Sequence, residues 1–209
     1  DILMWLEKGW IDYVTPQLYW EIGHKLADYD VLLDWWNKYG YGKHIYIGHG
    51  IYRAGTNAAW KDKNELPNQI KKLRAYSTTQ GSIYFSSKTF DKNPNGWNDS
   101  LRNNYYAYPA LPPRMPWIDS VAPEKPIVEK LNDGINQISY KGKESIKGYI
   151  VFVVDENKEP TLQNATLVQI ILYGGPTDID VFKWFNLKKR VFLATVNWSN
   201  NISEWVEMK

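Results

Sequence analysis

Cysteine is absent from the 209-residue chain, and this absence excludes several kinds of chemistry at once. Without a thiol there is no disulfide, no thiolate metal site and no cysteine nucleophile, although both oxidising and reducing compartments remain possible. The three histidines, His24, His44 and His49, are dispersed without the spacing of metal ligands, so we predict no zinc site. The sequence gives no reason to expect any other cofactor.

Long apolar runs and a large net charge are also missing. No stretch approaches the roughly 18 apolar residues of a membrane-spanning helix, and the formal charge is only +2, from 25 Lys and Arg against 23 Asp and Glu. This balance gives no extended field of one sign, so nucleic acid is not expected as a partner. The chain starts with Asp1 and shows no basic leader region, and we expect it to be a piece of a longer protein.

Aromatic residues, in contrast, are abundant, with 11 Trp and 15 Tyr. Large rings supply volume to protein cores, and they also stack on the apolar faces of sugars. Composition alone favours the use of these rings in a core. The position of each ring relative to the predicted strands and helices decides its interpretation.

A proline-rich segment from Tyr108 to Pro116 separates two regions of different periodicity. Proline lacks a backbone N–H donor and holds the chain extended, as in a linker. A chain of this length can form two domains, since most domains hold about 100 to 150 residues. We therefore predict a first domain of residues 1–116 and a second domain of residues 117–209.

In the first region, short β-branched or aromatic runs alternate with helical stretches. In chain order, the predicted elements are the strand Ile11–Pro16, the helix Tyr29–Tyr39, the strand His44–Ile47, the helix Leu66–Tyr76 and the strand Gly81–Phe85. Both helices carry apolar residues at spacings that form one face. The alternation implies parallel strands joined by right-handed crossovers, so the first region is predicted to be α/β.

The polar face of the second predicted helix carries Lys71, Lys72 and Arg74. Three basic residues so close together can form a binding patch. A solvated helix surface is the commoner arrangement, and it is the interpretation that we prefer.

Beyond Pro126 the pattern changes to short apolar or alternating strands separated by turn residues. The predicted strands are Ile135–Tyr140, Gly148–Val154, Leu167–Leu172, Val191–Val196 and Trp205–Met208. No helix is predicted in this region. About ninety residues of this kind predict an all-β sandwich of two sheets, of the immunoglobulin or fibronectin sort.

Candidate functional residues follow the predicted strands of the first region. Chemistry in a parallel barrel collects at the carboxyl ends of strands, because the loops there can vary without disturbing the core. Each of the three strands is followed by a polar donor near an aromatic ring, a combination that suits the flat faces and hydroxyls of a sugar. The candidate substrate-binding residues are Gln17, Tyr19, Trp20, His49, Tyr52, Ser86 and Lys88.

Each candidate also has a structural alternative. Gln17 can be a satisfied amide near the rim of a barrel, and Tyr19 and Trp20 can close the end of the barrel. His49 lies between Gly48 and Gly50. Glycine occurs where a ligand or a neighbouring segment comes close to the main chain, so this motif leaves both possibilities open.

Glycoside hydrolysis usually requires two carboxyl groups that flank the scissile bond. Asp12 comes early in its strand, and Glu65 lies in the first turn of a helix, where the helix dipole favours an acidic residue. Glu21 alone follows a strand end closely enough to project into a cleft, so it is the one catalytic candidate. We expect the catalytic pair on strands outside this chain.

Several segments resemble the final part of the bacterial glycosyl hydrolase-like family ten. They are Trp10–Trp20, Leu33–Trp36, Ile45–Gly50, Gln80–Ser87 and Asn95–Trp97, and together they cover roughly residues 1–108. The resemblance implies a partial (β/α)8 TIM barrel that contains the last three of its eight strands. It also implies that the whole protein is a secreted or lipid-anchored hydrolase of peptidoglycan or a related polysaccharide.

The second region resembles a fibronectin type III domain in the segments Ile146–Phe152 and Phe192–Ser203. Modules of this kind often have no ligand of their own. The complete chain is therefore expected to combine a TIM-barrel end with a fibronectin type III-like β-sandwich.

Three functional interpretations follow. In the first, this chain supplies part of the substrate cleft of a glycoside hydrolase and is inactive alone. In the second, it is a non-catalytic carbohydrate-binding module. In the third, the sandwich acts as a spacer or interaction module. The family resemblance implies an extracytoplasmic location, in the periplasm or as a surface or outer-membrane lipoprotein.

Three parallel strands cannot close a barrel, and open strand edges present unpaired backbone groups to other chains. We therefore expect that the chain either self-associates through these edges or is a stable remnant left by proteolysis of a longer protein.

Overall fold

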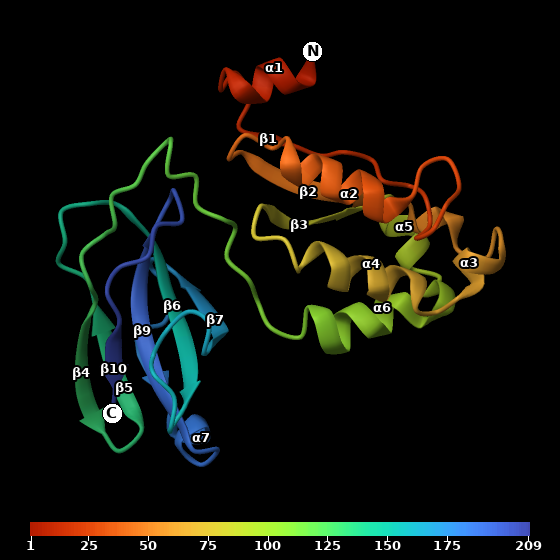
Figure 1. Cartoon of the computed structure of the whole chain (residues 1–209). Helices are drawn as coiled ribbons and strands as arrows, with labels where there is room; N and C mark the ends of the chain where they lie inside the picture. Colours follow the sequence, from red (N-terminus) through yellow and green to blue (C-terminus); the bar gives the residue numbers. More distant parts are fainter. The chain divides into compact units, whose positions relative to one another are not determined.

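The computed structural model describes residues 1–209, and its internal contacts divide the chain into two compact units (Figure 1). The first unit is Asp1–Ala107 and the second is Tyr108–Lys209. This division falls at the start of the proline-rich segment, whereas the sequence placed it at the end. The segment belongs with the second unit because Leu111 packs against one of that unit's cores.

The first unit is built on a sheet of three strands that are parallel, as predicted, and the structure gives their order as β1-β2-β3. The strands are β1 (Tyr13–Val14), β2 (His44–His49) and β3 (Thr79–Tyr84). The first strand is shorter than the predicted Ile11–Pro16. Pro16 has no N–H to donate to the sheet. Beyond it, pairing with β2 resumes as a single parallel bridge between Gln17 and Gly48.

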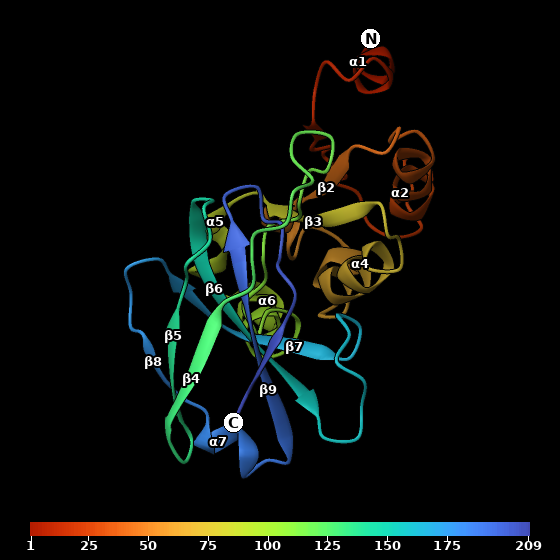
Figure 2. The same ribbon diagram turned by 90° about the vertical axis from the view of Figure 1, so that its left-hand side faces the viewer.

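Helices α2 (Tyr29–Lys38) and α4 (Glu65–Leu73) lie on the same side of this sheet (Figure 2). The Asp28 side chain accepts the Asp30 N–H and so caps the start of α2. Ile45 and Ile47 of β2 point into a core that also contains Leu33 of α2. Because side chains alternate along a strand, Tyr46 faces the other side of the sheet, where its ring packs edge-on against Tyr13.

Shorter helical segments complete the first unit. They are α1 (Ile2–Glu7), η1 (Ile51–Arg53), α3 (Ala58–Lys61), α5 (Ser87–Phe90), η2 (Pro94–Gly96), α6 (Trp97–Ser100) and η3 (Leu101–Tyr105). Trp60 and Trp97 are fully buried in a second core, where the Trp97 indole N–H donates to the Lys63 carbonyl. Of the neighbouring pair on α2, Trp36 packs on the core while Trp35 is 39% exposed. No helix in the chain is long and apolar enough to cross a membrane.

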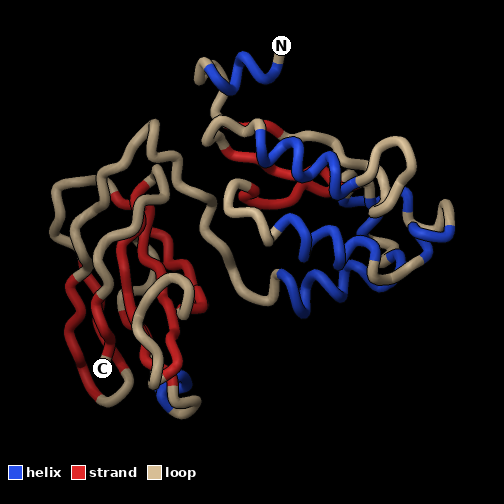
Figure 3. Tube along the Cα trace, in the orientation of Figure 1, coloured by secondary structure: helices blue, strands red, loops and turns tan.

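The second unit consists of two antiparallel sheets and a single helical turn (Figure 3). One sheet has the order β4-β5-β8, from β4 (Ile127–Asn132), β5 (Ile135–Ser139) and β8 (Asp178–Asp180). The other has the order β10-β9-β6-β7, from β6 (Ile146–Asp155), β7 (Ala165–Leu172), β9 (Lys189–Asn197) and β10 (Val206–Met208). Strands β4 and β8 and the helix α7 (Phe182–Phe185) were not predicted from the sequence.

The central strand β6 is buried on both faces, which explains its continuous apolar run. Val151 and Val153 point into the core shared by the two sheets. Phe152 points the other way, into a separate core. There the Trp205 ring stacks on Phe152 with 4.5 Å between ring centroids.

Candidate functional site

Three aromatic rings meet at the carboxyl ends of the three parallel strands. Tyr19 follows β1, Tyr52 follows β2 and Phe85 follows β3. The Tyr19 ring lies 5.8 Å from Tyr52 and 6.2 Å from Phe85, and the last two rings are 5.9 Å apart, measured between centroids. Tyr52 is 50% exposed and Phe85 is 56% exposed. The cluster therefore offers aromatic surface to a ligand, and we call Tyr19, Tyr52 and Phe85 the aromatic cluster.

A hollow of about 310 Å³ lies beside this cluster. Tyr52, Ser86 and Lys88 line it, together with Lys92 and Pro94. The structure therefore brings three of the predicted substrate-binding residues around one space. Sequence reasoning missed Phe85, although its position as the last residue of a predicted strand could have identified it.

The glycines on either side of His49 are required by a neighbouring segment of the same chain. A Cβ atom on Gly48 would lie 3.1 Å from the Pro16 carbonyl oxygen. A Cβ atom on Gly50 would lie 3.0 Å from both Cβ and Cγ of Tyr19. The segment after β1 therefore occupies the space beside these glycines. The main chain here is approached by a neighbouring segment of the protein and not by a ligand.

His49 itself is completely buried, between the rings of Tyr29 and Tyr84. Its Nδ1 lies 2.9 Å from Gln69 Oε1 and its Nε2 lies 3.2 Å from Ser82 Oγ. The Gln69 oxygen can only accept, so Nδ1 carries the proton and Nε2 accepts from the Ser82 hydroxyl. The predicted contact between His49 and substrate is therefore corrected, since both nitrogens are used inside the fold.

Burial lowers the pKa of His49 to about 4, even though the hydrogen bond with Gln69 acts in the opposite direction. The charged imidazolium would have to leave water without a carboxylate partner. The ring is consequently neutral at physiological pH, in the tautomer that its two hydrogen bonds fix.

Gln69 extends this arrangement into a buried polar network below the aromatic cluster. Its amide nitrogen donates to Glu65 Oε1 at 2.8 Å and to the Trp20 carbonyl at 3.2 Å. Glu65 also accepts the Ile22 N–H at 2.9 Å. The network therefore ties α4 to the segment after β1. No sequence pattern indicates this network, because its members come from distant positions.

Glu65 is 7% exposed, and burial raises the pKa of its carboxyl group. The hydrogen bonds from Ile22 and Gln69 partly oppose this shift. The sequence assigned Glu65 to the first turn of a helix, and the structure places it there. The carboxyl group points into the fold and not toward solvent, so it supports the site from within.

Glu21 is partly buried next to the short helix α3. Its Oε1 accepts from the Asn57 side chain at 3.1 Å and its Oε2 accepts from the Trp60 indole N–H at 2.9 Å. Desolvation acts to raise its pKa, but hydrogen bonds from its own backbone, from Trp60 and from Asn57 outweigh it and lower the pKa. Glu21 also borders a hollow of about 580 Å³ that His24 shares.

The two remaining candidates lie at the edge of this arrangement. Gln17 is exposed, with its backbone bridged to Gly48. Trp20 is partly buried and is joined to the buried network through its carbonyl oxygen, while its ring is not part of the aromatic cluster. No group of three or more His, Asp or Glu side chains is placed to hold a metal ion.

Much of this chain is similar in sequence to known glycosyl hydrolases. The profile of the family glycosyl hydrolase-like 10 matches residues 1–66. Glycosyl hydrolase YngK of Bacillus subtilis (strain 168) is 39% identical over 175 residues, which cover 78% of this chain and 34% of YngK. Glycosyl hydrolase DigH of Escherichia coli (strain K12) is 31% identical over 101 residues, which cover 44% of this chain and 23% of DigH.

These similarities support a glycosyl hydrolase-like family and a glycoside hydrolase-like role, and they suggest that the parallel sheet is a TIM-barrel end. The chain spans about a third of YngK and about a quarter of DigH. Since 78% of the chain exceeds the 107 residues of the first unit, the similarity to YngK extends into the second unit.

Proposed function

We propose that the first unit forms one wall of the sugar-binding cleft in a glycoside hydrolase that acts on bacterial cell-wall glycan or a related polysaccharide. The observation that carries this proposal is the aromatic cluster at three parallel strand ends, next to a hollow lined by Ser86 and Lys88. Exposed rings suit the apolar faces of a sugar, and the hydroxyl and amine suit its hydroxyl groups. Strand ends are also where parallel barrels carry their chemistry.

The catalytic carboxyl groups are proposed to lie outside these 209 residues. Hydrolysis usually needs one carboxyl group as acid and a second as base or nucleophile. The lowered pKa of Glu21 keeps it ionised at neutral pH, which is unsuitable for the acid, and Asn57 and Trp60 already occupy its two oxygens. Glu65 has a raised pKa but is buried under the cluster. The chain alone is therefore expected to bind glycan without hydrolysing it.

The proposal is tested by removing rings from the aromatic cluster. Tyr52→Ala and Phe85→Ala are each expected to weaken binding of solubilised peptidoglycan glycan strands by about 1 to 3 kcal/mol, as for a ring at a binding hot spot. Isothermal titration calorimetry on the 209-residue chain measures the change. Tyr41→Asn is the matched control, because Tyr41 is 47% exposed in the loop before β2. Asparagine tolerates the left-handed backbone there, at φ 49°.

An unchanged affinity in both ring variants would assign the cluster to packing and overturn the proposal. A loss of equal size in the Tyr41 control would show that the rings bind glycan without a defined site. Hydrolysis by the isolated chain would show that the catalytic carboxylates are within it.

For the second unit we propose a fibronectin type III-like spacer or interaction module. Seven antiparallel strands divided between two sheets support this fold. Trp184 packs against the core between the sheets and Trp205 stacks on Phe152, which favours a structural use of these rings. Trp198 is 68% exposed, which leaves carbohydrate binding as the alternative function. The family resemblance supports an extracytoplasmic location for the whole protein.

A further inference from the structure

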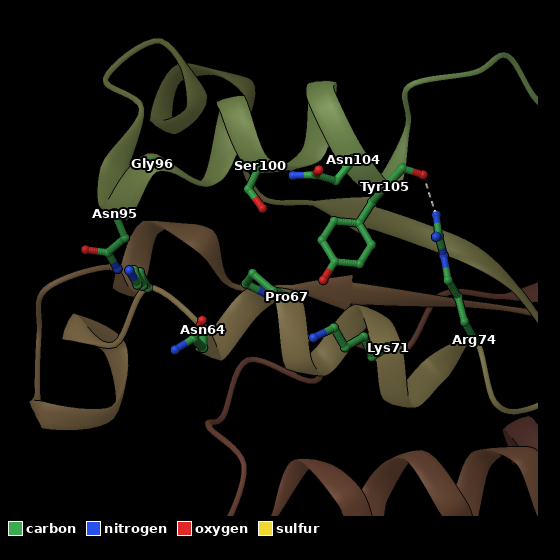
Figure 4. A pocket seen from close by; sticks show the side chains of 10 residues that line it. Asn64, Pro67, Lys71, Arg74, Asn95, Gly96, Ser100, Asn104 and Tyr105 are labelled. Carbon is green, nitrogen blue, oxygen red and sulfur yellow. Dashed lines mark hydrogen bonds between the residues drawn. The ribbon is translucent and has the colours of Figure 1, made fainter.

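A third hollow, larger than the two described above at about 680 Å³, lies on the first unit between α4 and the segment that contains α6 and η3 (Figure 4). It shares no lining residue with the hollow at the strand ends. Lys63, Lys71 and Arg74 line it along α4, and amide and hydroxyl side chains line the opposite wall. We call this hollow the α4 groove.

The α4 groove concentrates positive charge. Three cationic side chains line it and no carboxylate does, in a chain whose net charge is only +2. Lys72, the next residue after Lys71, instead forms an ion pair with Asp30 at 2.6 Å. The basic run was interpreted as one solvated helix face. The structure divides it, because consecutive helical residues point in different directions, and only Lys71 and Arg74 reach the groove.

Arg74 is held in place at one end of the α4 groove. Its guanidinium donates to the Tyr105 carbonyl at 2.7 Å and lies 5.4 Å from the centroids of the Tyr105 and Tyr106 rings. Figure 4 shows the Tyr105 ring between the two walls, above α4. Because this arginine is already ordered, less conformational entropy is lost when an anion binds to it.

The spacing of the charges indicates what kind of anion fits. Lys63 precedes the first turn of α4, whereas Lys71 and Arg74 lie at its last turn and just beyond. The nine residues of α4 rise roughly 14 Å, at 1.5 Å per residue. A single phosphate ion is too small to contact both ends, whereas a chain with repeated negative groups can reach both. Asn64, Ser100 and Asn104 offer hydrogen-bonding groups to the hydroxyls of such a chain.

We propose that the α4 groove binds a linear acidic oligosaccharide, independently of the aromatic cluster. Carboxylates of the sugar chain contact Lys63 at one end and Lys71 and Arg74 at the other. Binding that depends on exposed charges weakens as salt screens them. The groove would therefore hold an acidic polysaccharide close to the first unit whether or not the strand-end site is occupied.

Helix stability is the competing explanation for part of this arrangement. Cations near the carboxyl end of a helix interact favourably with its dipole. Lys71 and Arg74 would then stabilise α4 without binding anything. That explanation gives no role to Lys63, which lies at the opposite end of the helix.

Calorimetric titration of the 209-residue chain with a linear oligogalacturonate at low ionic strength tests the proposal. The double variant Lys63→Gln/Lys71→Gln is expected to bind about tenfold more weakly, from two exposed charge contacts. Lys38→Gln/Lys72→Gln is the matched control, because it removes the same amount of charge from α2 and from another side of α4. This control should change the affinity less than about twofold. Thermal unfolding of both variants separates a loss of binding from a loss of fold.

Two further titrations make the result specific. The Tyr52→Ala/Phe85→Ala variant should bind oligogalacturonate as the unmodified chain does, so failure of the strand-end site and failure of the α4 groove are distinguishable. Inorganic phosphate should bind far more weakly than the oligosaccharide. The proposal is overturned if oligogalacturonate does not bind, if phosphate binds equally well, or if the control pair or the ring variant loses as much affinity as the groove variant.

Discussion

His49 lies at the end of β2 with Gln69 on one ring nitrogen and Ser82 on the other. From the sequence it resembled a residue that meets a ligand, because it follows a strand and stands between two glycines. The structure uses it instead to join β2, β3 and α4 under the aromatic cluster. Because the buried imidazole of His49 is neutral, the stability of the fold should depend on pH.

The free energy of unfolding should fall as the pH is lowered from about 6.5 to about 4. In this range the unfolded chain binds a proton at His49, whose ordinary pKa is 6.5, while the folded chain, with a pKa of about 4, does not. Stability linked to this group is therefore complete above pH 6.5, and roughly 3 kcal/mol is lost by pH 4. Urea denaturation at a series of pH values measures the loss.

The variant His49→Asn separates this effect from the titration of carboxyl groups. It should be less stable than the unmodified chain at pH 7, because the packing between Tyr29 and Tyr84 is lost, but its stability should depend less on pH between 6.5 and 4. Equal pH dependence in both proteins would show that His49 is protonated inside the fold.

At the scale of the element, the loop after β1 can lie against β2 because Gly50 has no side chain. The backbone of Gly50 has φ −85° and ψ 63°, close to the inverse γ-turn conformation, which does not require glycine. Gly50→Ala should therefore act through its contact with Tyr19, 3.0 Å from the new Cβ, and not through the backbone. We expect a loss of about 1 to 3 kcal/mol in stability, as for other overpacked sites, and weaker glycan binding because Tyr19 is displaced.

Gly81→Ala serves as the control for this substitution. Its new Cβ would approach the Tyr46 ring at 3.3 Å, in the same sheet but away from the aromatic cluster. Chemical denaturation and calorimetric titration of both variants provide the comparison. If glycan affinity fell by the same amount in both, the position of Tyr19 would not be the cause.

Elements with strong local signals could be predicted from the sequence, and the others depend on tertiary pairing. The helix α2 combines a capping Asp28 with an apolar face, and it was placed within one residue of its observed ends. Strand β8 has two aspartates in three residues, a composition that disfavours strands, and it forms because it pairs with β5. Strand β4 is mostly exposed and lacks the apolar run of a central strand.

The residues of the candidate site also form two groups, those that could be predicted from the sequence and those that could not. Tyr19, Tyr52 and Ser86 could be found because they follow strands that the sequence shows clearly. The buried network could not be found, since Gln69 and Glu65 look like ordinary helix residues until α4 is placed against the sheet. Residues that contact solvent at strand ends carry a positional signal, whereas residues that support them from another element carry none.

At the scale of the whole molecule, the parallel sheet has two open edges. β1 and β3 each pair only with β2, so the outer side of each strand presents backbone N–H and C=O groups. Tyr13 is 54% exposed and Ile83 is 48% exposed on these two strands. Edges of this kind pair readily with strands of other chains.

We therefore predict that the 209-residue chain self-associates in a concentration-dependent manner, as size-exclusion chromatography with light scattering would show. Ile83→Lys places a charge on the edge strand β3 and should shift the chain toward the monomer, because a charged residue opposes strand pairing between chains. Leu162→Lys, at a side chain that is 63% exposed in the second unit, is the matched control and should leave the association unchanged. A monomer at every concentration would contradict the prediction and show that the exposed side chains, together with the local twist, already protect these edges.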